Sequence, residues 1–292
     1  MQRRHILSRA IRPKIDTDWP RLRQVLSEIG GQKGEAIVCG ADEQDLESIC
    51  NRIVHQFGIA LELGELTVIY LETIRKPAEA EGKYIRPGNY AHIKVRIGPN
   101  ESGKGFEFIS DIKSGVVPQQ YIEPIELGIL EALQGGVLAG YEIVDVRVTV
   151  FDGSYHDVDS NEMAFRIAGA IAFREAARKA NPVVLEPVMN VKATVREEFM
   201  GMFMADLNDR RGRIEGMASE GHSFAIRAIV PLSEILGTSA PEWPEYSVQF
   251  ARYEVATRRR DSGEDDPGVS VIRPNRPTGR SGSAALNLEA DS

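Results

Sequence analysis

The sequence predicts an α+β protein made of three small folded units followed by a polar tail. Segments with an apolar residue at every second position alternate with segments whose apolar residues recur every three or four positions, the periods of strands and helices. The 292 residues include 42% hydrophobic and 27% charged side chains, a composition typical of chains that fold around buried cores. We expect the folded units at residues 1–75, 76–183 and 184–258.

Residues 1–75 have the order strand, helix, strand, helix, strand. An extended stretch at 5–14 precedes an amphipathic helix, and a short strand at 35–39 precedes a second helix that ends at Gly58. Cys50 lies on the apolar stripe of this second helix, so we expect it in the core. A last strand at 66–73 completes the unit.

Residues 76–183 begin with a Pro-containing connector. A strand at 93–97 alternates apolar and polar residues, and we expect residues 106–109 to pair with it. A helix at 122–133 and a long alternating strand at 144–150 follow. Residues 152–160 then form a loop before a helix at 162–180, whose small side chains permit close packing.

Residues 184–258 follow the order strand, helix, strand, strand, helix, strand, which is the pattern of a ferredoxin-like sandwich. We place Phe199, Met200, Phe203 and Met204 of its first helix in the core. From residue 259 to 292 the chain has too few apolar residues to offset the entropy lost on ordering, so this tail is predicted to be disordered.

Charge and motifs exclude several classes of protein. The net charge of −8 argues against a protein that coats nucleic acid, so any RNA contact must be local. Cys39 and Cys50 are too few for a disulfide framework or a four-cysteine zinc site, and no stretch reaches the roughly 18 apolar residues of a membrane span. No signal peptide is evident, which favours the cytoplasm. We expect no metal site, no catalytic residues and no P-loop for nucleotide phosphates.

Several motifs carry a resemblance to a known family. They include GKYIR at 82–86, SGVVPQQYIEPIELGILEAL at 114–133, GYEIVDVRVTVFDGSYHDVDSNEMAFRIAGAIAFREAARKANPVVLEP from residue 140 and EEFMGMFMADLNDRRGRIEGM at 197–217. Together they resemble bacterial elongation factor G, the translocase of the ribosome, over residues 5–257. The resemblance implies that the three units correspond to that factor's third, fourth and fifth domains.

The resemblance also implies fold and partners. The first and last units would be ferredoxin-like, and the middle unit an elongated arm with a left-handed βαβ crossover. In the family this arm mimics tRNA and reaches the decoding centre of the small subunit, where it acts on tRNA and mRNA during translocation. The last domain faces large-subunit rRNA and the stalk base. The GTPase domain, with its GTP and magnesium, and the β-barrel after it are missing from this sequence, so we expect no cofactor and a monomer.

Two loops of the arm are the candidate RNA-binding site. The first contains Asp152, Gly153, Ser154, Tyr155, His156 and Asp157, and the resemblance assigns His156 to a tip histidine important for translocation. Glycine permits a close backbone approach, and serine, tyrosine and histidine can bond or stack on RNA. The second is shortened to Pro87, Gly88, Asn89 and Tyr90. Without the resemblance, the pair Asp152-Gly153 would indicate only an ordinary turn.

Arg210, Arg211 and Arg213 are further candidates for RNA contact. Cations at the end of a helix that is followed by glycine are equally explained by helix capping, so both interpretations stay open. The missing domains leave two readings of the whole chain. It is either the carboxy-terminal part of a divergent elongation factor G or a stand-alone paralogue that serves as a protein-binding adapter without translocase activity.

Overall fold

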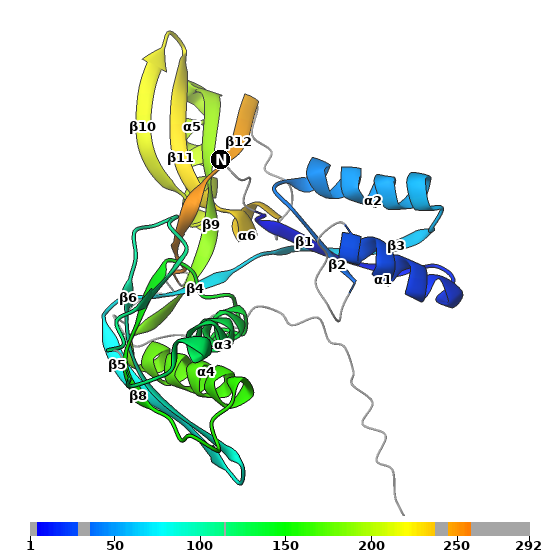
Figure 1. The fold of residues 1–292 in the computed structure, drawn as a ribbon. Coiled ribbons are helices and arrows are strands. Elements are labelled where there is room, and N and C mark those ends of the chain that lie inside the picture. The colour runs from blue at the N-terminus through cyan, green and yellow to red at the C-terminus, as the bar shows by residue number, and fades with distance from the viewer. Residues whose placement is uncertain (1–4, 29–35, 114, 237–244, 258–292) are drawn as a thin grey trace, which may run out of the picture.

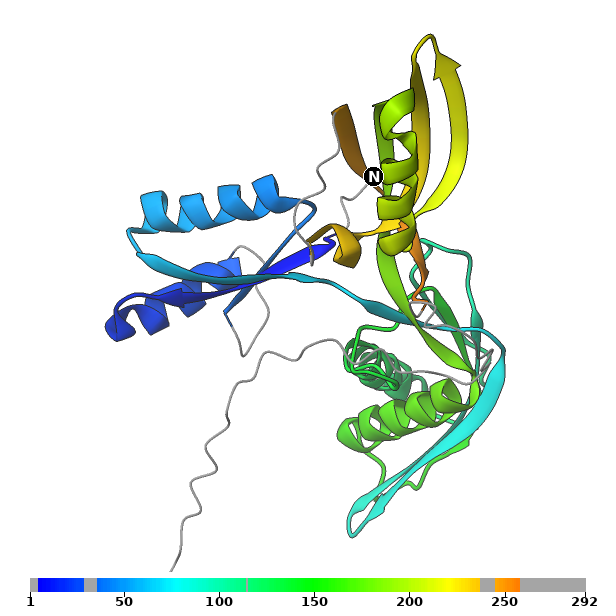
Figure 2. The ribbon, with the colours of Figure 1, turned by 180° about the vertical axis from the view of Figure 1, so that it is seen from behind.

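The computed structural model describes residues 5–28, 36–113, 115–236 and 245–257. Within these ranges the strands form three sheets, and helices cover one face of each, as Figure 1 shows. The α+β class predicted from the periodicity is confirmed. Figures 1 and 2 show the three units extending in different directions from a shared junction.

The first sheet has the antiparallel order β2-β1-β3, from β1 (Leu7–Pro13), β2 (Ile37–Gly40) and β3 (Leu61–Val68). A 3-10 turn, η1 (Asp16–Asp18), leads into α1 (Trp19–Glu28), and α2 (Glu43–Phe57) follows β2. The Asp42 side chain accepts a hydrogen bond from the Asp45 amide at the start of α2, and Gly58 ends the helix with φ 65°. Cys50 is buried, as predicted.

The prediction of a single strand at 66–73 is wrong, because this segment contains parts of two strands that belong to different sheets. β3 ends at Val68, and β4 (Leu71–Ile74) pairs with β9 (Pro182–Arg196) of the third sheet. Residues 68–71 are all apolar, so the sequence pattern does not reveal the crossing between sheets. The Tyr253 hydroxyl donates a 3.0 Å hydrogen bond to the Ile69 carbonyl at the crossing.

The second sheet forms the arm and has the order β5-β6-β8-β7. Its strands are β5 (Ala78–Arg86), β6 (Asn89–Pro99), β7 (Phe106–Ser110) and β8 (Val146–Ser154). Two expectations are corrected: the connector after residue 76 contains β5, and β7 pairs in parallel with β8, not with β6. The segment from β7 through η2 (Gln119–Tyr121) and α3 (Ile122–Gln134) to β8 is a βαβ unit whose left hand stays a prediction.

α4 (Glu162–Lys179) packs beside α3 against this sheet, and small residues permit the close approach. A Cβ atom built on Gly82 of β5 would lie 2.1 Å from the Ala168 carbonyl oxygen, and one on Gly169 would lie 2.7 Å from that of Ile125. The predicted role of the small side chains of α4 is therefore confirmed.

The third sheet has the order β10-β11-β9-β12, which is the ferredoxin-like arrangement. It contains β9, β10 (Arg213–Glu220), β11 (Ser223–Pro231) and β12 (Glu245–Val255), together with η3 (Glu197–Phe199), α5 (Met200–Asp209) and α6 (Leu232–Leu236). Phe203 and Leu207 are buried. Phe199 is not a core residue: its side chain is 36% exposed and lies under the Arg196 guanidinium, because the helix begins with an outward-facing turn.

A buried carboxylate joins the arm to β4. Glu72 is fully buried, and its two oxygens accept hydrogen bonds of 2.7 to 3.1 Å from the backbone amides of residues 137–141, in the loop after α3. Its own amide and carbonyl bond to Glu142 and Val144. The base of the arm is thereby fixed to the strand that connects it to the first unit.

Candidate functional site

The candidate site is the end of the arm farthest from the junction, at the lower end of Figure 1. Two segments meet there: the tight turn between β5 and β6, where Gly88 has φ 69°, and the loop between β8 and α4. We call residues 87–90 and 155–161 together the arm tip.

Asn89 and Tyr90 hold the loop in place. The Tyr90 amide donates to the Asp159 carbonyl (2.8 Å), and the Ser160 hydroxyl donates to the Tyr90 carbonyl (2.7 Å). The Asn161 side-chain amide donates to Oδ1 of Asn89 (2.8 Å). The structure therefore brings together the two tip segments that the sequence predicted, and it assigns Asn89 and Tyr90 a positioning role.

His156 lies on the outer side of this loop. Its backbone amide donates to the Ser160 hydroxyl (2.9 Å), and its Nδ1 accepts from the amides of Val158 (3.4 Å) and Asp159 (3.2 Å). Nδ1 also lies 3.3 Å from Oδ2 of Asp159, so this side of the ring faces its own loop. The side chain is 56% exposed, so the other ring nitrogen and an aromatic face are presented to the surroundings.

The neighbours of His156 make the arm tip partly apolar. Tyr155 is 39% exposed and Val158 is 83% exposed, while Asp157 is also exposed. The Tyr90 ring lies 6.5 Å from the His156 ring, centroid to centroid. Exposed rings beside hydrogen-bond donors suit the unstacked bases of single-stranded RNA.

Asp152, Gly153 and Ser154 belong to β8, which corrects their prediction as loop residues. Asp152 accepts a 2.8 Å hydrogen bond from Lys94, which holds the pKa of the carboxyl below its ordinary value. A Cβ atom on Gly153 would lie 2.6 Å from the His92 carbonyl oxygen. Glycine is therefore required for strand packing here, independently of any RNA.

Ser154 takes part in a hydrogen-bonded chain that the sequence reading missed. Its hydroxyl is 2.8 Å from the Tyr90 hydroxyl and 3.2 Å from Nδ1 of His92, and Nε2 of His92 is 3.0 Å from Glu81. Lys83 and then His92 lower the pKa of Glu81. The alternation along β6 was the available signal, since it puts His92 and Lys94 on one face of the strand.

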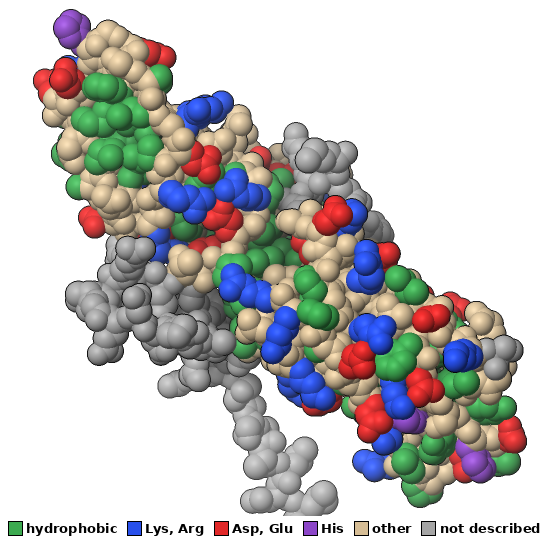
Figure 3. Space-filling model, turned by 90° about the vertical axis from the view of Figure 1, so that its left-hand side faces the viewer, with side chains coloured by type: hydrophobic (Ala, Val, Ile, Leu, Met, Phe, Trp, Pro, Cys, Tyr) green, Lys and Arg blue, Asp and Glu red, His purple; other side chains and the backbone are tan. Residues whose placement is uncertain are grey.

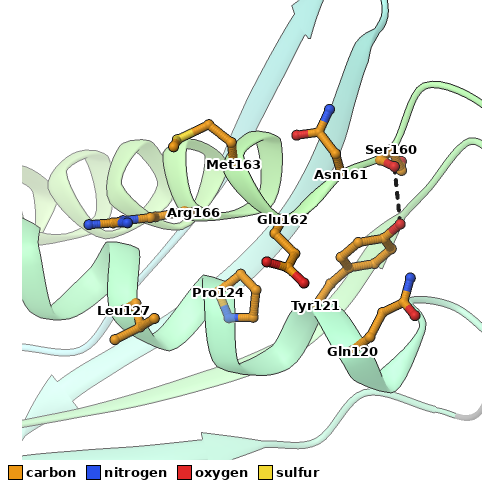
Figure 4. A pocket seen from close by; sticks show the side chains of 9 residues that line it. All are labelled: Gln120, Tyr121, Pro124, Leu127, Ser160, Asn161, Glu162, Met163 and Arg166. Carbon is orange, nitrogen blue, oxygen red and sulfur yellow. Dashed lines mark hydrogen bonds between the residues drawn. The ribbon is translucent and has the colours of Figure 1, made fainter.

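An open pocket lies behind the arm tip, between the first turns of α3 and α4. Figure 4 shows Tyr121 beneath the loop, where its hydroxyl donates a 3.1 Å hydrogen bond to the Ser160 carbonyl. Pro124, Leu127 and Met163 form its apolar wall. The Tyr121 ring also stacks on the buried Phe165, with centroids 4.4 Å apart, so the loop rests on the arm core.

Arg210 and Arg211 lie in the junction and not on an open surface. Arg210 is 7% exposed and bonds to Asp206 and to the Glu234 carbonyl. Arg211 donates to both oxygens of Glu186 (2.7 and 2.9 Å) and to Glu234 (2.7 Å). Burial opposes the charge of Arg211, but these carboxylates keep its pKa above the ordinary value. The RNA contact predicted for these two arginines does not fit their burial.

Arg213 is exposed and pairs with Glu254 at 3.1 Å.

In the described parts of the chain, no three His, Cys, Asp or Glu side chains gather as metal ligands. No helix in those parts has the length and apolar character needed to cross a membrane.

Comparison with known proteins identifies the domains. The family model described as elongation factor G, domain IV matches residues 66–181, and the model described as elongation factor G C-terminus matches residues 183–240. Residues 66–240 belong to the elongation factor G family. The arm is thus domain IV, and the ferredoxin-like unit after it is the C-terminal domain.

A solved structure resembles this chain over most of its length. The crystal structure of ttk003000868 from Thermus thermophilus superposes with a TM-score of 0.61 at 33% sequence identity, over 88% of this chain. The match covers 42% of the Thermus protein. The present chain is therefore elongation factor G-like, and it spans less than half the length of that relative.

Proposed function

We propose that this chain binds the ribosome through the arm tip and acts on tRNA and mRNA during translocation. The observation that carries the proposal is the presentation of His156. Two separate segments of the arm hold its loop through backbone hydrogen bonds, while the ring itself and Tyr155 stay exposed. A fixed loop with exposed rings loses little entropy when it contacts RNA.

GTP hydrolysis would come from another domain or polypeptide, because the proposed role of this chain is mechanical. The acidic net charge limits the RNA contact to the arm tip and local basic residues. Localisation in the cytoplasm and a monomeric state are part of the same proposal.

Co-sedimentation with bacterial ribosomes tests the proposal. We expect the full chain to pellet with ribosomes at low and moderate salt. His156→Ala should weaken binding by roughly tenfold, since one stacked base contributes about 1–3 kcal/mol, and should leave the thermal unfolding midpoint unchanged. His55→Ala, an exposed histidine of α2, is the matched control.

Two results would contradict the proposal: a folded chain that stays in the supernatant, or equal binding by His156→Ala and the wild type. Removal of residues 258–292 distinguishes the proposed function from the adapter alternative. Binding through the arm tip survives this deletion, whereas an adapter that uses the tail loses its partner.

A further inference from the structure

Within the described ranges, α5 packs on one face of the third sheet, and no described helix packs on the other face beside β10 and β11. Val191, Ala193 and Val195 of β9 pack with Phe203 and Leu207 of α5, so the residues at even positions of this strand point to the opposite face. We call this opposite side the open face. Figure 3 shows the molecule turned by 90° about the vertical axis from Figure 1, with an apolar area near one end that adjoins Lys, Arg, Asp and Glu side chains.

Two cations stand directly opposite each other on the open face. Lys192 of β9 and Arg227 of β11 are register partners, and both side chains are exposed. Among residues whose side chains the structure describes, neither has a carboxylate partner. Like charges at directly opposed positions destabilise a sheet. An anion placed between them would relieve this repulsion.

The surface beside these cations is formed by small side chains. Gly216, Ala218 and Ala225 line a shallow pocket with Thr194 and Ser247. The Arg227 guanidinium lies against Gly216, where a built Cβ atom would be 3.0 Å from the nearest nitrogen. An extended peptide can therefore approach the sheet closely at this point.

The opposite end of the open face is where the described chain stops. The Thr257 amide donates to Glu186 (3.4 Å), and its carbonyl accepts from Arg211 (2.7 Å). Glu186 lies on the same face of β9 as Lys192, since both occupy even positions. Six residues of strand separate them, which is about 20 Å.

The sequence after Thr257 carries charges in a matching order. Residues 258–260 are three arginines, Asp261 comes directly after them, and the acidic run Glu264, Asp265 and Asp266 follows. The three carboxylates lie seven to nine residues beyond Thr257, so an extended chain carries them about 23–32 Å, far enough to reach Lys192.

We propose that residues 264–266 of the chain's own tail dock on Lys192 and Arg227, so that the tail covers the open face. The tether keeps the effective concentration of the acidic segment near millimolar, although each exposed ion pair is weak. Docking is therefore reversible and salt-sensitive, and a stronger polyanion displaces the tail. The inference does not depend on ribosome binding by the arm tip.

Carbodiimide cross-linking of the full chain tests the docking, because this reagent joins a lysine amine to a carboxylate in direct contact. At low salt we expect mass spectrometry to find a link from Lys192 to Glu264, Asp265 or Asp266, within one chain when isotope-labelled and unlabelled chains are mixed. The pair Lys94–Asp152, 2.8 Å apart, is the internal positive control. In about 1 M salt, where the Debye length is about 3 Å, the tail link should disappear.

Variants complete the test without disturbing the core. Lys192→Arg keeps the charge and should lose the link, because arginine does not react. Converting all three carboxylates to lysine should also abolish it, whereas Glu289→Lys with Asp291→Lys, at the far end of the tail, should not. Absence of the tail link while Lys94 is cross-linked, or a link from Lys192 to Glu242 or Glu245 in its place, would overturn the proposal.

Discussion

The arm tip and the junction both depend on polar side chains, but they differ in exposure to solvent. At the arm tip, His156 is more than half exposed, and its loop is held through neighbouring backbone groups. At the junction, Glu72 is fully buried and Glu186 and Arg211 nearly so, with their charges satisfied by fixed partners. Polar groups at the arm tip remain available to a ligand, whereas those at the junction hold parts of the molecule together.

The largest expected effect is at Glu72. Glu72→Ala leaves five backbone amides in the base of the arm without their acceptor, and such a loss at a buried charge costs about 4 kcal/mol of unfolding free energy. Urea unfolding followed by circular dichroism measures it. Glu79→Ala, which removes an exposed partner of Arg96, should cost less than about 1 kcal/mol. Equal costs would contradict the distinction between the two regions.

Arg211 gives the next largest effect. Arg211→Ala leaves Glu186 buried without its cation, so we expect a loss of about 3 kcal/mol. Arg213→Ala, two residues away, removes an exposed pair and should change stability by less than about 1 kcal/mol. The same unfolding measurement compares the two variants. Wild-type stability in Arg211→Ala would show that the junction does not need this charge.

Ser160 tests how firmly the arm tip is held. Ser160→Ala removes the acceptor for the His156 amide and the donor to the Tyr90 carbonyl, which should cost about 1–2 kcal/mol. Hydrogen exchange at the His156 amide should become faster, while amides of α4 keep their protection. Unchanged exchange at His156 would mean that the loop is held in another way.

The smallest effect concerns pH. Lys94 holds the pKa of Asp152 below its ordinary value, so the stabilisation is present above the unfolded-state pKa of about 3.9 and is lost as pH falls through the folded-state value. In Lys94→Ala we expect the Asp152 pKa to rise toward its ordinary value in an NMR titration. Lys104→Ala, which removes the exposed Lys104–Glu101 pair, should leave it unchanged. No rise in Lys94→Ala would mean that the Gly153 amide alone sets the pKa.

Periodicity predicted the α+β class and most helices because their apolar stripes are long, as along α2 and α3. It missed β5, whose sequence is mostly polar and half exposed. It joined β3 to β4 because residues 68–71, which span the crossing, are continuously apolar. The predicted pairing of β7 was also wrong. The path of the chain through α3 decides which strand β7 pairs with, and the local sequence pattern does not.

The candidate site was predictable in part. The meeting of the tip residues Asn89, Tyr90 and His156 could be predicted, because the resemblance placed both of their segments on the arm. The contribution of His92 and Glu81 was missed because it depends on the register between β5 and β6. The adjacent arginines 210, 211 and 213 look alike in sequence, and only the third is exposed, because Arg211 adopts φ 55° and turns into the junction.

The pairing of β4 with β9 has a mechanical consequence. β4 leads into the arm and β9 leads out of it, so both chain connections at the base are hydrogen-bonded to each other over residues 71–74 and 182–185. The carbonyl of Ala180 also accepts from the amides of Arg75 and Lys76. Because the two connections are hydrogen-bonded to each other, neither can act as a flexible hinge at the base of the arm by itself. A torque applied to the third sheet is therefore transmitted to the arm, and the displacement is largest at His156.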